Sequence, residues 1–543
     1  MQQRRRKTHI KTRQGAALLG FGALALSAGT AMAQDANFGG LDNDPNAIRG
    51  FHLTYGAGLT ETLTDNVRGT ASGGNLLANG AGAISTGGNG READLVTTIA
   101  PNVTLADVTR RAQFAFTYTP SYSKFAAASD LDRFDNAFTG TGNFDLWHEH
   151  LVLDTTASVS RQIINNQGAV TTSGLNSSVN QTNVSTFTLS PTYSTRFGDF
   201  ATGQLKYLLG FTDSGVTAPT VQNQVSAGVT SGNDFSQLQW SVTFSDTETD
   251  QGDQSNSGEL VNSAVNPTTT GNLSDRVAQA QVNYALTRSL TLLSGFGYEK
   301  ITDDTVSANN QNGPIGSFGI GVDGAFLHFK LNYNFRYGSQ FASFDGSADI
   351  SENLKVLASY GESIQTQQSL AIQNASNIGF AGTQNGQPGF FTPVGNNQLA
   401  FNPTPASGGI NNGLGNASFL NKNGQIAVTG NYDRDSWSLT LQQNSQSSSQ
   451  VNFNETTLNV TAGYQRQLTP STRFNLNLGY FNVSQTSPSA SSDNTYDAAA
   501  GLSYELGQGV TTSGTYSFLY RRSSQSGQDI RANSLILTLN KAF

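Results

Sequence analysis

Few side chains in this sequence could do chemistry, and they lie far apart. His148 and His150 flank Glu149 in an extended stretch and could bind a metal ion, but no third ligand accompanies them, so we interpret them as part of a turn. His328 alternates with apolar residues beside Lys330, which favours a wall residue over a catalyst. With no Ser/His/Asp constellation and no cysteine, we predict no enzymatic activity and no cofactor.

An acidic run at residues 246–253 is the other candidate for ion binding. Its carboxylates, spaced by two, could share a Ca²⁺ ion or bridge to lipopolysaccharide through a divalent cation. The run lacks the glycine and glutamate positions of an EF-hand. We therefore interpret it as a solvated acidic loop.

The composition narrows the class of protein. Charged residues make up 13% of the 543 residues, about half of the roughly 25% typical of soluble globular domains. The 32 Phe and 17 Tyr argue against a disordered chain. After residue 33 there is no run of about 20 apolar residues, so no transmembrane helix is predicted. Low charge, many aromatic residues and 58 Gly are typical of a β-barrel with a lipid-facing exterior and a polar interior.

The N-terminal segment has the layout of a secretory signal peptide. Six basic residues precede the apolar stretch 15–26, and Ala31-Met32-Ala33 is a cleavage motif, so we predict a signal peptide over residues 1–33. Without it the chain has 24 basic and 38 acidic residues, a net charge of −14, which disfavours nucleic acid as a partner. Residues 34–50 have no strand pattern and are predicted to be a short periplasmic lead-in.

Alternation of apolar and polar residues predicts the strands. In residues 327–337 one face is wholly apolar or aromatic, and the other consists of polar residues. We predict that this polar face lines a lumen. The candidate lumen-lining residues are His328, Lys330, Asn332, Asn334 and Arg336. Thr186, Thr188, Ser190 and Thr192 form a similar polar face, as do Asn475 and Asn477.

Counting such segments predicts a single all-β transmembrane barrel over residues 51–543, an up-and-down antiparallel meander of about 22 strands with a range of 18 to 22. The least regular strands are 219–230 and the Gly-rich 315–322. Short turns and longer loops alternate, as expected of periplasmic turns and extracellular loops. The longest loop, residues 366–422, either constricts the lumen or lies outside it.

The C-terminal strand has apolar residues on one face and ends on an aromatic residue. Leu535, Leu537, Leu539 and Phe543 resemble the C-terminal signal that the barrel assembly machinery reads in bacterial outer-membrane barrels. Lys541 stands where an apolar residue is usual, and Ile536 interrupts the polar face. We therefore predict that the chain resides in the outer membrane of a Gram-negative bacterium, in contact with lipid and lipopolysaccharide.

Three segments in the N-terminal third carry a more specific pattern. They are residues 59–67, with the motif Thr64-Asp65-Asn66, residues 91–105, and the aromatic residues 116–122. Together they resemble the outer-membrane barrels associated with the PEP-CTERM/exosortase system and exopolysaccharide gene clusters. The resemblance covers about residues 50–160. It implies a role in the export or display of polysaccharide, with periplasmic export components as partners, and it brings no catalytic residues.

The leading functional expectation is an outer-membrane conduit for a hydrophilic polymer, and exopolysaccharide is the expected cargo. A neutral, hydrogen-bonding lumen suits hydroxyl-rich solutes, because no ring of basic or acidic residues is legible that would select ions of one sign. Two alternatives stay open. One is a general diffusion porin for small hydrophilic solutes, and the other is a structural or adhesive surface barrel.

Overall fold

The structure is a computed structural model in which part of the chain is described. The described residues are 50–69, 91–109, 111–148, 150–163, 181–214, 219–251, 271–304, 310–336, 338–366, 369, 372, 381–384, 387–394, 398–403, 418–448, 453–487, 490–524 and 528–543. The predicted signal peptide and the lead-in up to residue 49 lie outside them.

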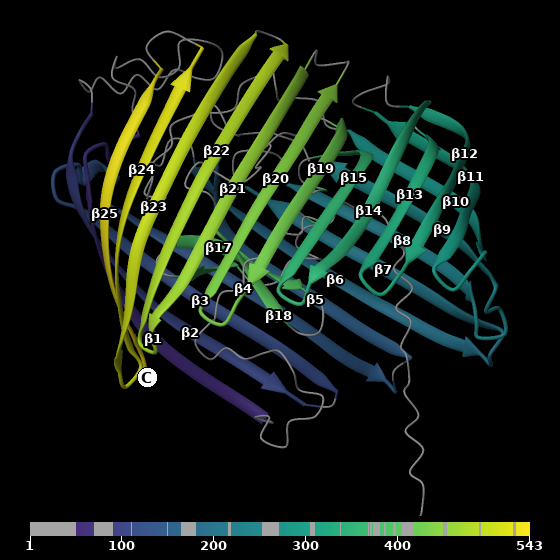
Figure 1. Ribbon diagram of the computed structural model, residues 1–543, viewed down its shortest axis with the longest axis horizontal. Helices are drawn as coiled ribbons and strands as arrows, with labels where there is room; N and C mark the ends of the chain where they lie inside the picture. The colour runs from purple at the N-terminus through teal and green to yellow at the C-terminus, as the bar shows by residue number, and fades with distance from the viewer. Residues whose placement is uncertain are drawn as a thin grey trace, which may run out of the picture.

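The described chain is a 22-stranded antiparallel sheet and a separate three-stranded sheet (Figure 1). The barrel strands are β1 (Gly50–Thr64), β2 (Asp94–Val108), β3 (Ala112–Phe125), β4 (Arg133–Trp147), β5 (Leu151–Ile163), β6 (Gln181–Phe197), β7 (Ala201–Asp213), β8 (Thr220–Ser231), β9 (Leu238–Gln251), β10 (Asn272–Ala285), β11 (Leu290–Asp303), β12 (Gln311–Asp323), β13 (Leu327–Arg336), β14 (Ser339–Ser351), β15 (Leu354–Thr366), β19 (Ser418–Asn431), β20 (Asp435–Ser448), β21 (Phe453–Thr469), β22 (Thr472–Ser487), β23 (Ser491–Gly507), β24 (Val510–Ser523) and β25 (Ile530–Ala542). The small sheet comprises β16 (Ala381–Gln384), β17 (Gln387–Val394) and β18 (Gln398–Pro403), and a 3₁₀ turn, η1, spans Ser129–Leu131.

The large sheet closes on itself. Each barrel strand pairs with the next along the chain, β15 pairs with β19 across the intervening segment, and β25 pairs with β1 from Gly56 opposite Ala542 to Thr64 opposite Ser534. The predicted barrel is confirmed, with a strand count at the upper end of the predicted range. The two least regular predicted strands are present as β8 and β12.

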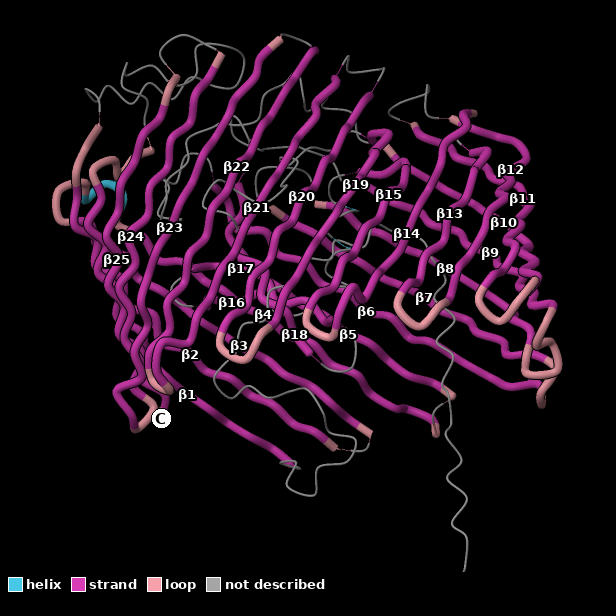
Figure 2. Tube along the Cα trace, viewed as in Figure 1, coloured by secondary structure: helices cyan, strands magenta, loops and turns pink. Residues whose placement is uncertain are grey.

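The two ends of the barrel differ, as predicted. One end, here called the turn end, carries the short connections, such as 198–200, 352–353, 470–471 and 508–509, together with Gly50 and Phe543. The other, the loop end, carries longer connections, of which residues 65–93 and 367–417 are the largest. Figure 2 shows the strands tilted between these two ends. Short turns mark the periplasmic side of such a barrel and long loops the extracellular side.

The exterior of the barrel carries the apolar side chains. Leu331, Tyr333 and Phe335 on β13 are exposed, as are Leu535, Leu537 and Leu539 on β25, because these side chains point away from the sheet with no protein layer outside it. Among the described residues, no helix has both the length and the apolar character needed to cross a membrane.

Aromatic residues form a band near each end of this apolar surface. Towards the loop end, six outward tyrosines each donate the hydroxyl proton to an amide oxygen on the following strand, at 2.6–2.9 Å. These pairs are Tyr118–Asn136, Tyr207–Asn223, Tyr298–Asn312, Tyr333–Gln340, Tyr480–Asn494 and Tyr516–Asn533. Near the turn end lie Trp147, Phe197, Phe200 and Tyr504. Closure pairs the backbone groups that would otherwise face hydrocarbon, and an apolar belt between two aromatic bands matches the hydrocarbon core and the two interfaces of a bilayer. The chain is an outer-membrane β-barrel.

The β2–β3 ladder is interrupted at mid-height. Pairing runs from Val96–Phe125 to Ile99–Tyr122 and resumes at Val103–Tyr118. Pro101 and Pro120 lie in the unpaired stretches of the two strands. Because proline has no N–H to donate to the ladder, placing both prolines at one interruption confines the loss of hydrogen bonds to a single site.

The outward face of β13 gives a test of the membrane placement. Leu331 is 42% exposed on the apolar side, and Asn332 lies on the opposite side of the same strand. Replacing Leu331 by Arg should lower the free energy of unfolding from a bilayer by about 2–4 kcal/mol, because the folded barrel would then hold a guanidinium in hydrocarbon. Urea titrations in lipid vesicles measure this difference. The matched variant Asn332→Arg should change stability little, and equal losses for the two variants would contradict the assignment of faces.

Candidate functional site

The five predicted lumen-lining residues share the inward face of β13, but their surroundings differ along the strand. At the turn end His328 is exposed and its Nδ1 lies 2.5 Å from Asp323 Oδ1, while Lys330 is exposed as well. Asn332 and Asn334 are half-buried, and the Asn334 amide donates to Ser343 Oγ at 2.8 Å. The strand therefore runs from an open vestibule into a packed interior.

At the packed end of β13, Arg336 joins two carboxylates. Its guanidinium donates to Glu299 Oε1 at 2.8 and 2.5 Å and lies 3.6 Å from Asp275 Oδ2. Glu299 is only 2% exposed, and a buried carboxylate is tolerated only with such a partner. We did not single out Glu299 from the sequence, although it lies on the polar face of β11.

Two further strands show the same division. On β7, Gln204 near the turn end is exposed, whereas Leu208 and Thr212 towards the loop end are buried. On β25, Asn540 is exposed and Ser534 is buried. On β7, β13 and β25 the inward residues near the turn end are therefore open to solvent and those towards the loop end are covered, whereas on β19 Ala427 and Thr429, near the turn end, are buried.

Part of the connection between β15 and β19 lies inside the barrel. Ile372 is fully buried against the inward position Gly210 of β7, where a Cβ atom would collide with its side chain. The strand β16 lies beside β4. Ten strands separate β4 from β15 in either direction around the barrel, so the segment reaches the opposite wall. Figure 1 shows β17 and β18 within the outline of the barrel. The connection spans residues 367–417, somewhat shorter than the predicted 366–422.

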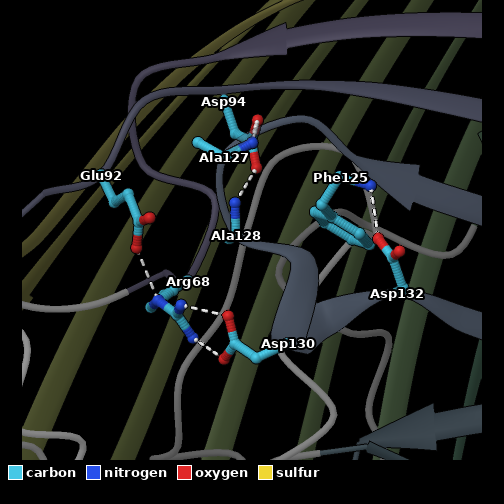
Figure 3. Close-up of polar contacts among 8 residues, drawn as sticks. All are labelled: Arg68, Glu92, Asp94, Phe125, Ala127, Ala128, Asp130 and Asp132. Carbon is cyan, nitrogen blue, oxygen red and sulfur yellow. Dashed lines mark hydrogen bonds and ion pairs between the residues drawn. The ribbon is translucent and has the colours of Figure 1, made fainter.

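The described parts of two loop-end connections, residues 65–69 and 91–93 between β1 and β2 and residues 126–132 between β3 and β4, are held together by polar contacts (Figure 3). Arg68 donates from Nε to Glu92 at 2.6 Å and through both terminal nitrogens to Asp130 at 2.8 and 2.7 Å. The hydrogen bonds from Arg68 hold the pKa of Asp130 below its usual value, and the pKa of Arg68 is raised by the same contact. The bridge ties the β1–β2 connection to η1.

Asp94 organises the β3–β4 connection from within. Its carboxylate accepts the backbone N–H groups of Leu95, Ala127 and Ala128 at 2.8–2.9 Å. Beneath these hydrogen bonds lies a small apolar core. It consists of Val67, Val96, Phe125, Ala128 and Leu131. A carboxylate that satisfies three amides fixes the loop over this core.

The Thr64-Asp65-Asn66 motif fastens the seam of the barrel. Asp65 accepts two hydrogen bonds from Asn533 of β25, from the backbone N–H at 2.8 Å and from Nδ2 at 2.6 Å, and it pairs with Arg91. The Asn66 amide donates to the Arg531 carbonyl at 3.0 Å. The motif that carried the family resemblance therefore joins the first strand to the last at the loop end.

The predicted assembly signal lies on the outer face of β25 and at the chain end. Leu535, Leu537, Leu539 and Phe543 are exposed, and the Phe543 ring stacks on Tyr55 at 5.4 Å. Lys541 donates to the Gln508 carbonyl at the turn end and lies over the Phe543 ring. The ammonium thus reaches the membrane edge, which explains how a lysine is accommodated on this face.

The remaining candidates show no catalytic arrangement. His148 and His150 lie at the turn between β4 and β5, and His150 Nδ1 contacts the Ser194 carbonyl at 2.9 Å. Within the described part of the chain, no group of three or more metal-binding side chains comes together.

The acidic run was wrongly predicted as a loop. It continues β9 up to Gln251, and Asp246 and Glu248 pair with Arg276 of β10 at 3.1 and 3.0 Å. These cross-strand ion pairs extend the sheet above the apolar belt, where both faces of a strand can be polar. The rest of the run, from residue 252, lies outside the described residues.

Comparison with known proteins adds three loose structural similarities. The siderophore receptor PirA from Acinetobacter baumannii aligns with 90% of this chain and 80% of its own, at 9% identity and a TM-score of 0.44. PirA from Pseudomonas aeruginosa covers 91% and 80% at 10% identity and 0.39, and OccAB3 from Acinetobacter baumannii covers 90% and 99% at 9% identity and 0.31. No protein-family model and no curated protein matches the sequence.

Asp94 gives a test of the contacts that hold these loop-end connections. Replacing it by Ala leaves the amides of Ala127 and Ala128 without an acceptor, at a cost of about 1–3 kcal/mol for each amide that stays buried. We expect limited proteolysis to cleave residues 126–132 faster in this variant, while the barrel stays folded. Asp94→Asn keeps one acceptor oxygen, so its cleavage rate should lie between those of the unchanged protein and of Asp94→Ala. Cleavage at an unchanged rate would show that the carboxylate does not hold the loop.

The Arg68–Asp130 bridge predicts a pH dependence. Since the folded-state pKa of Asp130 lies below its ordinary value of 3.8, its contribution is complete above that value and is lost as the pH falls through the folded-state pKa. The protection factors of the η1 amides, which correct for the pH dependence of intrinsic hydrogen exchange, should therefore stay constant down to pH 3.8 and then fall. An Asp130→Asn variant should lack this acid step, and a step of equal size in that variant would assign the change to another group.

Proposed function

We propose that this barrel is a gated outer-membrane conduit for a hydrophilic polymer. The observation that carries the proposal is the sheet β16–β18 and its flanking Ile372 inside a 22-stranded barrel. Barrels of this size have a lumen wide enough that transporters fill it with a plug. In this chain a segment between two barrel strands occupies that position, so the wall and the obstruction form one covalent unit.

Exopolysaccharide is the proposed cargo. The inward wall is rich in hydroxyl and amide groups, such as Thr188, Asn332 and Gln425, which can exchange hydrogen bonds with a sliding chain of sugars. The resemblance of residues 50–160 to exopolysaccharide-associated barrels supports the same assignment. The open vestibule at the turn end would receive the chain from periplasmic export components.

The contact between Ile372 and Gly210 is the proposed seat of the gate. Gly210 is the only side-chain-free residue in its register row across β6–β9, whose other members are Thr188, Gln222 and Thr249. A side chain at Gly210 would fill the hollow that Ile372 occupies. Any substitution there should push the inserted segment off the wall, because packed interiors do not yield to an extra methyl group without displacement.

Single-channel recording in planar bilayers tests the gate. The intact barrel should conduct little, and Gly210→Val or Ile372→Gly should produce long-lived open levels. Deletion of residues 373–414 should give the largest conductance. Gly361 is the matched control, since it faces inward on β15 and a Cβ there meets nothing within 4 Å. Gly361→Val should conduct as the intact protein does.

The outcomes separate the alternatives. Steady, large conductance of the intact protein would contradict the gate and favour a diffusion porin. Absence of conductance in every variant would favour a structural barrel. If the variants open as expected, a strain lacking the protein should also lose secreted polysaccharide, and retention of normal polysaccharide would refute the proposed cargo.

A further inference from the structure

A row of register partners crosses the inner wall beneath the inserted segment. Thr156 of β5, Thr188 of β6, Gly210 of β7, Gln222 of β8 and Thr249 of β9 are successive register partners. Every member of the row is neutral, and all but the glycine carry a hydroxyl or an amide. The row is therefore a band of hydrogen-bonding groups around a central hollow.

One member of this row and two hydroxyls near it have no hydrogen-bond partner among the described residues. Gln222 is 0% exposed, and neither its Oε1 nor its Nε2 makes a hydrogen bond with any residue that the structure describes. The same holds for the hydroxyls of Thr220, two residues further along the inward face of β8, and of Ser190 on β6. By contrast, Thr156 and Thr188 satisfy each other at 2.5 Å. Other unpartnered atoms occur elsewhere in the barrel, such as Asn421 Oδ1 on β19, but these three residues lie on β6 and β8, on the two sides of the β7 strand that carries Gly210.

Buried amides and hydroxyls without partners are costly and uncommon in folded proteins. Leucine or valine at these positions would pack under the inserted segment without that cost. The polar residues are therefore better explained by a second state, in which the segment has left Gly210 and the wall meets a ligand. The hollow at Gly210 lets that ligand approach the backbone closely.

We propose that Gln222, Thr220 and Ser190 form a binding site for a neutral hexose chain, which competes with Ile372 for the hollow at Gly210. The Gln222 amide carries both a donor and an acceptor and can bind two neighbouring sugar hydroxyls at once. Ser190 lies two strands away, a separation of about 10 Å at the usual strand spacing. One sugar ring does not span that distance, so the site suits linked rings rather than a monosaccharide.

The site rests on the proposed function in one respect, since the inserted segment must leave the wall before the ligand can bind. Binding and opening are then linked, because a ligand that binds only the open state shifts the equilibrium towards it. A polymer entering from the vestibule would in this way hold its own passage open.

The test uses linear neutral hexasaccharides, one α-1,4-linked and one β-1,4-linked, on the full-length Ile372→Gly barrel. Each should block the open current in discrete events. Adding Gln222→Leu should shorten the mean block time about tenfold, the loss expected for one or two neutral hydrogen bonds. Leucine keeps the volume and removes the unpartnered atoms, so the variant should fold at least as well as its parent. Glucose alone should not block.

The matched control is Gln204→Leu, which removes an inward amide of the open vestibule on the same wall. It should leave the block time unchanged. Equal effects of the two substitutions, or none from Gln222→Leu, would overturn the proposal and leave a wall that only water contacts. If Ile372→Gly fails to conduct, calorimetric titration of the same variant with the hexasaccharides tests the sugar-binding site separately from the gate. Binding that depends on Gln222 would then support the site while the gate fails, and no binding would refute the site as well.

Discussion

The pairing of β25 with β1 is the constraint on which the rest of the structure depends. In hydrocarbon an unpaired strand edge leaves a row of backbone groups without partners, so the sheet must close. Closing 22 strands fixes a lumen too wide to be filled by the wall's own side chains. The interior then needs a separate occupant, and the connection between β15 and β19 enters it. The seam, the lumen and the inserted segment are thus consequences of one requirement.

The seam is reinforced where the ladder alone is weakest. At the loop end the last barrel pairs give way to connections, and Asp65 and Asn66 continue the junction with side-chain bonds to β25. At the turn end Phe543 stacks on Tyr55 and donates its backbone N–H to the Tyr55 carbonyl. Two chain segments nearly 500 residues apart are therefore fastened at both edges of the membrane. Thr64-Asp65-Asn66 and Phe543 are recognisable as motifs in the sequence, but only the fold shows that both join the first strand to the last.

The barrel could be predicted from the sequence because its signal is local. Alternation with a period of two repeats in each strand, and lipid on one side forces it, so even the Gly-rich β12 was placed correctly. The contents of the lumen could not be predicted in the same way. The segment 367–417 has no such periodicity, and its contact between Ile372 and Gly210 joins positions about 160 residues apart. Glu299 was missed for a similar reason, since only the fold brings Arg336 to it. The acidic run was misassigned because strands above the apolar belt lose the alternation that marks them.

The covered part of the lumen around Gly210 holds two opposing requirements. Ile372 packs into a hollow that fits it, which favours the closed arrangement, while Gln222 and Thr220 are left beneath the segment without partners, which disfavours it. A wall optimised only for closure would be apolar there, and a wall optimised only for passage would have no hollow for an isoleucine. The coexistence of the two features on adjacent strands β7 and β8 is what an element with two arrangements of similar free energy requires. In the proposed mechanism the arrangement that prevails is set by the ligand that reaches this row from the vestibule.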